Sequence, residues 1–109
     1  MAIIGRDPQD MFMAARELER VGGGLTAVLN GQVLATVALP IAGLMSPLTV
    51  ADVASQETDL EAALTKLGLP QSYPIHLLAM ALPVVPQIRL TDLGLVDIAS
   101  QQFIPALAG

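Results

Sequence analysis

The segment LPIAGLMS at Leu39–Ser46 is the feature that most constrains how this chain can fold. It is almost entirely apolar, yet Pro40, Gly43 and the following Pro47 exclude a regular helix or a central strand. An apolar segment that can join neither a helix nor a sheet ladder needs a surface to lie against. We therefore predict an ordered loop, packed either on the domain's own hairpin or against a partner domain.

A β-hairpin is predicted directly before this loop. Residues 25–29 and 32–38 flank Asn30-Gly31, a dipeptide typical of two-residue type I′ turns. This turn would pair Val28 with Val33 and Ala27 with Leu34. One face would then carry Leu25, Ala27, Leu29, Leu34 and Thr36, and the other Thr26, Val28, Val33, Ala35 and Val37. Because neither face is polar, we expect the hairpin to be covered on both sides.

A helix over about residues 8–21 is predicted before the hairpin. Asp7 is expected at the N-cap, Pro8 at the first helical position and Asp10 at the capping-box position. Apolar residues follow at helical spacing, and the triple glycine at residues 22–24 ends the helix. Because these glycines follow a helix rather than open one, they do not indicate a phosphate-binding loop.

A second helix is predicted over about residues 50–67, with Thr49 as its cap and Gly68 beyond its end. Thr58 and Glu61 could form another capping box, which leaves open a kink or two abutting helices. The hairpin packed by the two helices predicts a single small α/β (α+β) domain over residues 1–109, with a mostly antiparallel sheet.

Shorter extended segments complete the prediction. Ala2–Gly5 is expected to be a short buried strand, and residues 74–82 are a continuous apolar run that favours a helix only weakly over a strand. Further extended pieces are predicted at residues 88–90, 95–98 and 102–107, with a turn at residues 91–94.

The composition is too apolar for a small self-contained domain. Counted with glycine and without tyrosine, about 61% of the residues are apolar, against about 45–50% in typical soluble domains. No apolar run is long enough to span a bilayer, and no signal peptide is evident, so we expect a cytoplasmic protein without a membrane partner. The net charge of −5 argues against a nucleic-acid partner. The excess of apolar residues predicts either a homo-oligomer or a part of a larger protein.

Few residues are candidates for chemistry. His76 is the only histidine and has no ligand-type residue at a suitable spacing, so a core or interface position is favoured over metal binding. Asp92 and Asp97 favour an Asx-type turn over acid–base work. No nucleophile–base–acid set is present. For Pro40, Ile41, Gly43, Leu44 and Met45, an interface with a partner domain competes with packing on the domain's own hairpin.

The order of motifs along the chain resembles one family. These motifs are Ile3-Ile4-Gly5-Arg6-Asp7, Asp10-Met11, Gly22-Gly23-Gly24, Asn30-Gly31, the LPIAGLMS segment, Leu67-Gly68, Ala81-Leu82-Pro83-Val84-Val85-Pro86, Leu90-Thr91-Asp92 and Gly94-Leu95-Val96-Asp97. Together they resemble the C-terminal domain of bacterial and archaeal adenine deaminases, from about Ile3 to Ile104. The family has a basic residue where this chain has Leu93.

The resemblance implies a parent enzyme of the amidohydrolase class, active in purine metabolism. In that enzyme a catalytic (β/α) barrel precedes this domain, and a divalent metal, manganese or iron, activates the water that converts adenine to hypoxanthine and ammonia. The resemblance implies that the metal ligands and a His-rich segment lie upstream of this chain. It therefore predicts an accessory domain that has no cofactor, catalytic residue or metal ligand of its own and is inactive alone. The alternatives are a stand-alone small-ligand-binding or oligomerisation module of the same fold and, less favoured, an enzyme in its own right.

Overall fold

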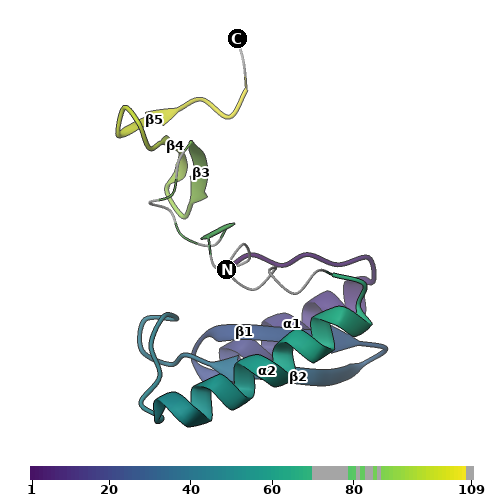
Figure 1. The fold of residues 1–109 in the computed structure, drawn as a ribbon. Helices are drawn as coiled ribbons and strands as arrows, with labels where there is room; N and C mark the ends of the chain where they lie inside the picture. The colour runs from purple at the N-terminus through teal and green to yellow at the C-terminus, as the bar shows by residue number, and fades with distance from the viewer. Residues whose placement is uncertain (70–78, 81, 83–84, 86, 108–109) are drawn as a thin grey trace.

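The computed structural model describes residues 1–69, 79–80, 82, 85 and 87–107 (Figure 1). The described residues form two antiparallel sheets and two helices, which confirms the predicted small α+β fold. One sheet has the order β1–β2 and the other the order β3–β4–β5. The elements are α1 (Pro8–Val21), β1 (Gly24–Leu29), β2 (Gln32–Ala38), α2 (Val50–Lys66), β3 (Ile88–Thr91), β4 (Gly94–Asp97) and β5 (Gln102–Ile104).

The start of α1 confirms one predicted cap and corrects the other. Asp7 is the N-cap, and its carboxylate accepts a hydrogen bond from the Gln9 amide at 3.0 Å. Asp10 does not close a capping box. Its two carboxylate oxygens accept from the amides of Asn30 and Gly31, at 2.9 and 2.7 Å. The hairpin turn leaves these amides outside the β ladder, and the packing of α1 places Asp10 against them.

The hairpin register differs from the prediction on one side of the turn. Val28 pairs with Val33 as predicted, but Ala27 pairs with Ala35 instead of Leu34 because a β-bulge interrupts the ladder. The pattern of alternation alone assumes a regular ladder, so it could not place the extra residue. The shift puts Leu25, Ala27, Ala35 and Val37 on one face, and it pairs Thr26 with Thr36 on the other.

The hairpin lies between the two helices, so both of its faces are covered, as predicted (Figure 1). The face with Ala27, Ala35 and Val37 packs on α2 and forms the core. The other face meets α1, on which Met11, Ala14, Leu18 and Val21 are half-buried. The buried core residues of the described part are Ala27, Ala35, Val37, Leu39, Leu60, Ala63 and Leu64.

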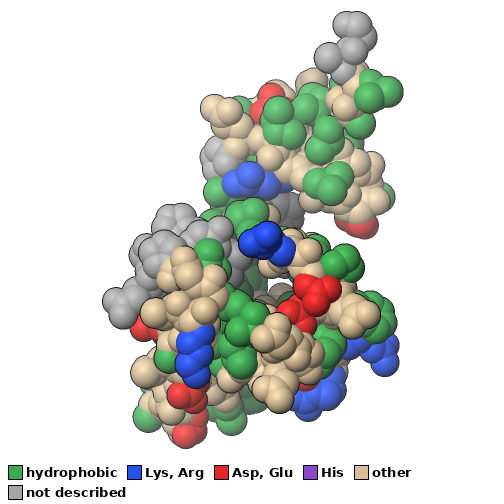
Figure 2. All heavy atoms as spheres, turned by 90° about the vertical axis from the view of Figure 1, so that its right-hand side faces the viewer, with side chains coloured by type: hydrophobic (Ala, Val, Ile, Leu, Met, Phe, Trp, Pro, Cys, Tyr) green, Lys and Arg blue, Asp and Glu red, His purple; other side chains and the backbone are tan. Residues whose placement is uncertain are grey.

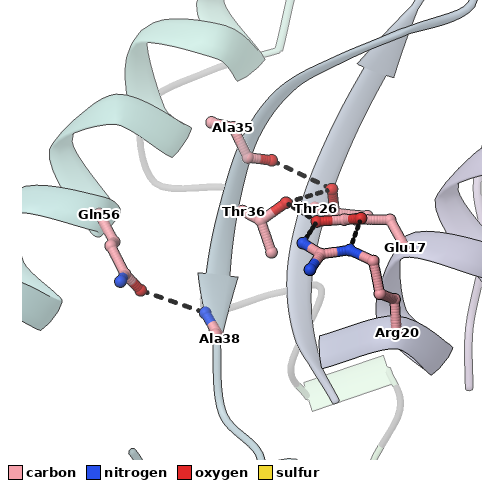
Figure 3. Close-up of polar contacts among 7 residues, drawn as sticks. All are labelled: Glu17, Arg20, Thr26, Ala35, Thr36, Ala38 and Gln56. Carbon is pink, nitrogen blue, oxygen red and sulfur yellow. Dashed lines mark hydrogen bonds and ion pairs between the residues drawn. The ribbon is translucent and has the colours of Figure 1, made fainter. Parts of the chain in front are cut away.

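A polar network joins α1 to the threonine face of the hairpin (Figure 3). The Thr36 hydroxyl donates to Glu17 at 3.3 Å and lies 2.9 Å from the Thr26 hydroxyl. Arg20 donates to both carboxylate oxygens of Glu17, at 2.7 and 2.8 Å. On the opposite side of the hairpin, Gln56 of α2 accepts from the Ala38 amide at 3.1 Å. Both helices are thus hydrogen-bonded to the sheet that they cover.

Glu17 makes the stability of this packing depend on pH. The Arg20 guanidinium, with a smaller contribution from Thr36, lowers the pKa of Glu17 below its ordinary value of 4.5, against the opposing effect of burial. Because the folded-state pKa is the lower one, the stabilisation is present above the unfolded value and is lost as the pH falls through the folded value. Urea unfolding should therefore show that Glu17→Gln lowers stability at pH 7 by about 1 kcal/mol, and that the deficit shrinks below pH 4.5.

Glu19→Gln is the matched control for this prediction. Glu19 forms the same type of i,i+3 pair with Arg16, at 2.7 Å, but both side chains are about two-thirds exposed. Exposed pairs of this kind contribute little, so Glu19→Gln should change stability by less than about 0.5 kcal/mol at either pH. Equal effects of the two substitutions would contradict a special role for Glu17.

The second helix is continuous, which excludes the kink that its sequence left open. α2 runs without a break from Val50 to Lys66, with Thr49 as the N-cap. The Thr58 hydroxyl donates to the Ala54 carbonyl one turn back, at 2.9 Å, and does not start a new helix. Leu60, Ala63 and Leu64 follow in the next turns and are buried, so packing on the hairpin favours one uninterrupted helix.

Of the strands predicted near the two ends of the chain, the one at the N-terminus is wrong and those near the C-terminus are confirmed. The predicted strand at Ala2–Gly5 is wrong: these residues form no strand and are exposed, Ile4 by 56%. The predicted extended pieces near the C-terminus are confirmed as β3, β4 and β5, although β5 ends at Ile104, next to Pro105. Of the apolar run at residues 74–82, Ala79 and Met80 are helical, and residues 74–78 and 81 lie outside the described part.

The molecule is more extended than a compact domain of this length. Its radius of gyration is 15.3 Å, compared with about 13 Å expected for 109 residues. The β3–β5 sheet stands apart from the helix–hairpin layers in Figure 1. Large apolar side chains on this sheet are consequently exposed, among them Leu90 by 79% and Phe103 by 62%.

Candidate functional site

The segment Leu39–Ser46 forms a tight, hydrogen-bonded loop. Ile41 and Met45 exchange backbone hydrogen bonds of 3.1 Å in both directions. Between them, Ala42 and Gly43 have φ values of 56° and 74°, and the Leu44 amide donates to the Ile41 carbonyl. Positive φ at both central residues is the geometry of a type I′ turn. The segment that proline and glycine exclude from regular structure therefore forms a short, well-defined hairpin.

The triple glycine after α1 is the surface on which this loop rests. Gly22 ends the helix in the left-handed conformation, at φ 84°, as predicted. The Gly23 carbonyl accepts from the Leu39 amide at 2.9 Å. A Cβ atom on Gly23 would lie 2.8 Å from the Gly43 backbone, so only glycine permits this approach. The two segments that the sequence marks as unusual are thus in direct contact.

Leu39 at the start of the loop is buried in the core, but the large apolar side chains from Ile41 to Met45 are exposed. Ile41, Leu44 and Met45 are exposed by 45%, 50% and 58%, while Gly43 is half-buried beneath them. Pro40 and Leu48 are exposed as well. We refer to Pro40, Ile41, Leu44, Met45 and Leu48 as the loop patch. Its backbone is held by hydrogen bonds and its apolar side chains face outward, which is typical of an interaction surface.

A groove runs along the outer edge of β1, and we call it the β1 groove. Its volume is about 1320 Å³. Residues 1–7 line one side, all of β1 lines another, and the two helices contribute apolar side chains. Ala42–Leu44 of the loop also reach it. Figure 2 shows apolar side chains around a hollow on one face of the molecule, interspersed with acidic and basic ones.

The remaining sequence candidates do not gather into a site. His76 lies outside the described residues. Asp92 is exposed in the turn between β3 and β4, where the Thr91 hydroxyl accepts from the Leu93 amide at 3.2 Å. Asp97 forms the predicted Asx turn by accepting from the Ala99 amide at 2.9 Å. Within the described residues, no group of three or more His, Cys, Asp or Glu side chains could hold a metal ion. The described residues therefore offer no ligand set for the divalent metal implied for the parent enzyme.

Comparison with known proteins identifies the family. The family model described as the adenine deaminase C-terminal domain matches residues 1–102. The chain belongs to this family. It is 43% identical over 107 residues to adenine deaminase 2 of Carboxydothermus hydrogenoformans, and 43% identical over 103 residues to adenine deaminase of Dehalococcoides mccartyi. These alignments cover 96% and 94% of the chain.

The adenine deaminase relatives are much longer than this chain. The aligned part is 19% of the C. hydrogenoformans protein and 18% of the D. mccartyi protein. An adenine deaminase of Roseobacter denitrificans, 43% identical over 109 residues, shows the same share of 18%. The C-terminal domain in each relative therefore accompanies about four-fifths of a polypeptide that this chain does not match. None of the described helices here is long and apolar enough to cross a membrane.

Sequence reasoning about this adenine deaminase domain found the loop but missed the groove. The loop was predictable because proline, glycine and apolar residues occur together in one short segment. The groove depends on which edge of the hairpin is left unpaired, and the alternation of residues does not reveal that. Two signals point toward it: the hairpin is apolar on both faces, and the predicted strand at Ala2–Gly5 has no obvious partner.

Proposed function

We propose that this chain is an accessory domain that docks on the catalytic part of an adenine deaminase through the loop patch. The parent enzyme would convert adenine to hypoxanthine and ammonia, and the 109 residues alone would not catalyse this reaction. The observation that carries the proposal is the loop patch itself, in a domain of this family: an ordered loop that presents Ile41, Leu44 and Met45 to the outside.

The geometry of the loop supports a docking role. Its backbone is fixed by the Ile41–Met45 hydrogen bonds and by the contact with Gly23, so binding would not need to order it. The exposed side chains are large and apolar, and their burial would contribute favourably. The same surface explains why the sequence is more apolar than a free-standing domain needs.

A chimaera tests the proposal. The matched part of the C. hydrogenoformans adenine deaminase 2 is replaced by this chain, and adenine-dependent ammonia release is measured. The chimaera should be active, and the purified 109-residue chain should release no ammonia. Ile41→Asp with Leu44→Asp places two charges at the proposed contact, where their desolvation is costly. This double variant should lower the activity or the thermal stability of the chimaera, with activity falling by about tenfold or more, equivalent to about 1.4 kcal/mol.

The matched control is Phe12→Asp with Val33→Asp. These two apolar residues are exposed by 67% and 41% and lie outside the loop patch. Circular dichroism of each variant as the isolated chain shows whether it still folds. Equal losses from the two double variants would contradict docking through the loop patch. Reproducible ammonia release by the isolated chain would contradict the accessory role.

A further inference from the structure

Among the residues that the structure describes, no strand pairs with the outer edge of β1, which faces the β1 groove. The hydrogen bond between Gly23 and Leu39 fixes the alternation along this strand. In an antiparallel ladder every second residue bonds to the partner strand, so Leu25, Ala27 and Leu29 face β2. The amides and carbonyls of Gly24, Thr26 and Val28 then face the groove. In the described residues β2 is the only strand that pairs with β1.

The backbone groups on the two long edges of the hairpin sheet have different surroundings. On the β2 edge, the Ala38 amide donates to Gln56 of α2, so a side chain satisfies part of that edge (Figure 3). Along the β1 edge the groove extends over all of β1, from Gly24 to Leu29. An open strand edge is a template for a further strand. The structure thus offers one edge to an additional segment.

The walls of the groove define what could occupy it. On the α1 side they include Met11, Ala14 and Leu18, and on the α2 side Leu64, Leu67 and Leu69. Asp10, Glu19 and Lys66 also line the groove, but most of the lining side chains on both walls are apolar. A strand between the walls would therefore need mainly apolar side chains on both of its faces, as in a buried central strand. The volume of about 1320 Å³ exceeds the roughly 300–1,000 Å³ of ordinary small-molecule sites. The groove therefore fits a polypeptide segment better than a small ligand.

The N-terminal residues indicate where such a segment comes from. Residues 1–7 line the groove, and Ala2–Gly5, for which a strand was predicted, forms no strand in the structure. In the relatives, the C-terminal domain follows the larger, unmatched part of the polypeptide. The position equivalent to the start of this chain therefore joins that part at the groove. A strand inserted there would have β1 on one side and Ile3 and Ile4 on the other.

We infer that an extended segment of the catalytic part of adenine deaminase, apolar on both faces, fills the β1 groove as an added strand paired with β1. This inference rests on the proposed function, because it takes the occupant from the same polypeptide. It assigns the groove a structural role in assembly in addition to docking through the loop patch, which adjoins the groove at Leu44. It also explains the failure of the strand prediction at Ala2–Gly5: the strand next to it would be supplied by the rest of the enzyme.

Amide hydrogen exchange at single-residue resolution tests the inference, in the isolated chain and in the chimaera with C. hydrogenoformans adenine deaminase 2. The amides of Thr26 and Val28 should exchange at least about 100-fold more slowly in the chimaera. The amides of Ala27 and Leu29, which face β2, should be protected in both proteins and serve as the internal control.

Ile4→Asp should reverse the protection. Ile4 lines the groove and is 56% exposed, so the isolated chain should tolerate the charge, whereas a filled groove should not. Exchange of the Thr26 and Val28 amides in the chimaera should accelerate by about tenfold or more. Ile4→Val keeps the site apolar and should retain the protection.

The outcomes separate this inference from the proposed function. An active chimaera in which Thr26 and Val28 exchange as fast as in the isolated chain overturns the inference alone. An inactive chimaera, or ammonia release by the isolated chain, overturns the proposed function instead. Protection of these amides in the isolated chain that grows with concentration, together with a dimer by light scattering, would show that a second copy occupies the groove and would overturn the inference.

Discussion

Gly24→Ala should destabilise the protein by about 4 kcal/mol or more, enough to prevent the hairpin from forming at 25 °C. Gly24 has a φ of 133°, which L-residues rarely adopt. A Cβ atom there would also overlap the Val37 carbonyl oxygen. Because that oxygen belongs to the backbone of the paired strand, it cannot move aside as a flexible side chain would. Urea unfolding followed by circular dichroism measures the loss.

Gly68→Ala is the control for this prediction. Gly68 also has a positive φ, of 83°, but nothing lies within 4 Å of the position that its Cβ would occupy. The substitution therefore adds only backbone strain, which costs about 1–2 kcal/mol. Similar losses for Gly24→Ala and Gly68→Ala would contradict a steric role for the triple glycine. If Gly24→Ala leaves no folded protein, Gly23→Ala provides a second comparison, because its contact with Gly43 is less severe.

Local chemistry made much of the fold predictable. Asn30-Gly31 located the hairpin because few other dipeptides adopt positive φ at both turn positions. Asp7 and Thr49 located the helix starts because their side chains satisfy free amides at the first turn. These signals act within a few residues along the chain. They therefore need no knowledge of the tertiary structure.

Features that depend on packing were not predictable. The β-bulge opposite Ala27 places Ala27 and Ala35 in the core and pairs Thr26 with Thr36 on the other face, an arrangement that becomes apparent only in the assembled layers. Asp10 leaves its expected helix cap because the hairpin turn supplies two amides from 20 residues away. The β1 groove was even less predictable from the sequence. Whether a strand edge is paired depends on which segments lie beside it in the folded protein. The loop was predictable as an ordered segment, but its contact with the triple glycine was not.

Leu60→Ala should cost about 3 kcal/mol of unfolding free energy, the second largest effect that we expect. Leu60 is the only fully buried large side chain in the described part, at 0% exposure, and it belongs to the cluster with Ala27 and Ala35. The other members of this cluster lie on the hairpin, directly after it or on α2 itself, and the backbones of the hairpin and α2 are fixed by the ladder and the helix, so they can close only part of the space that its removal leaves. The cavity should therefore persist.

The consequence of Leu60→Ala should extend beyond α2, because a two-stranded sheet has little stability of its own. Loss of the helix that covers its core face should release the hairpin in the same transition, and circular dichroism should show helix and sheet melting together. Leu48→Ala is the matched control: Leu48 is 46% exposed, and its truncation should cost less than about 1 kcal/mol. A Leu60→Ala variant as stable as Leu48→Ala would mean that α2 is not what holds the hairpin in place.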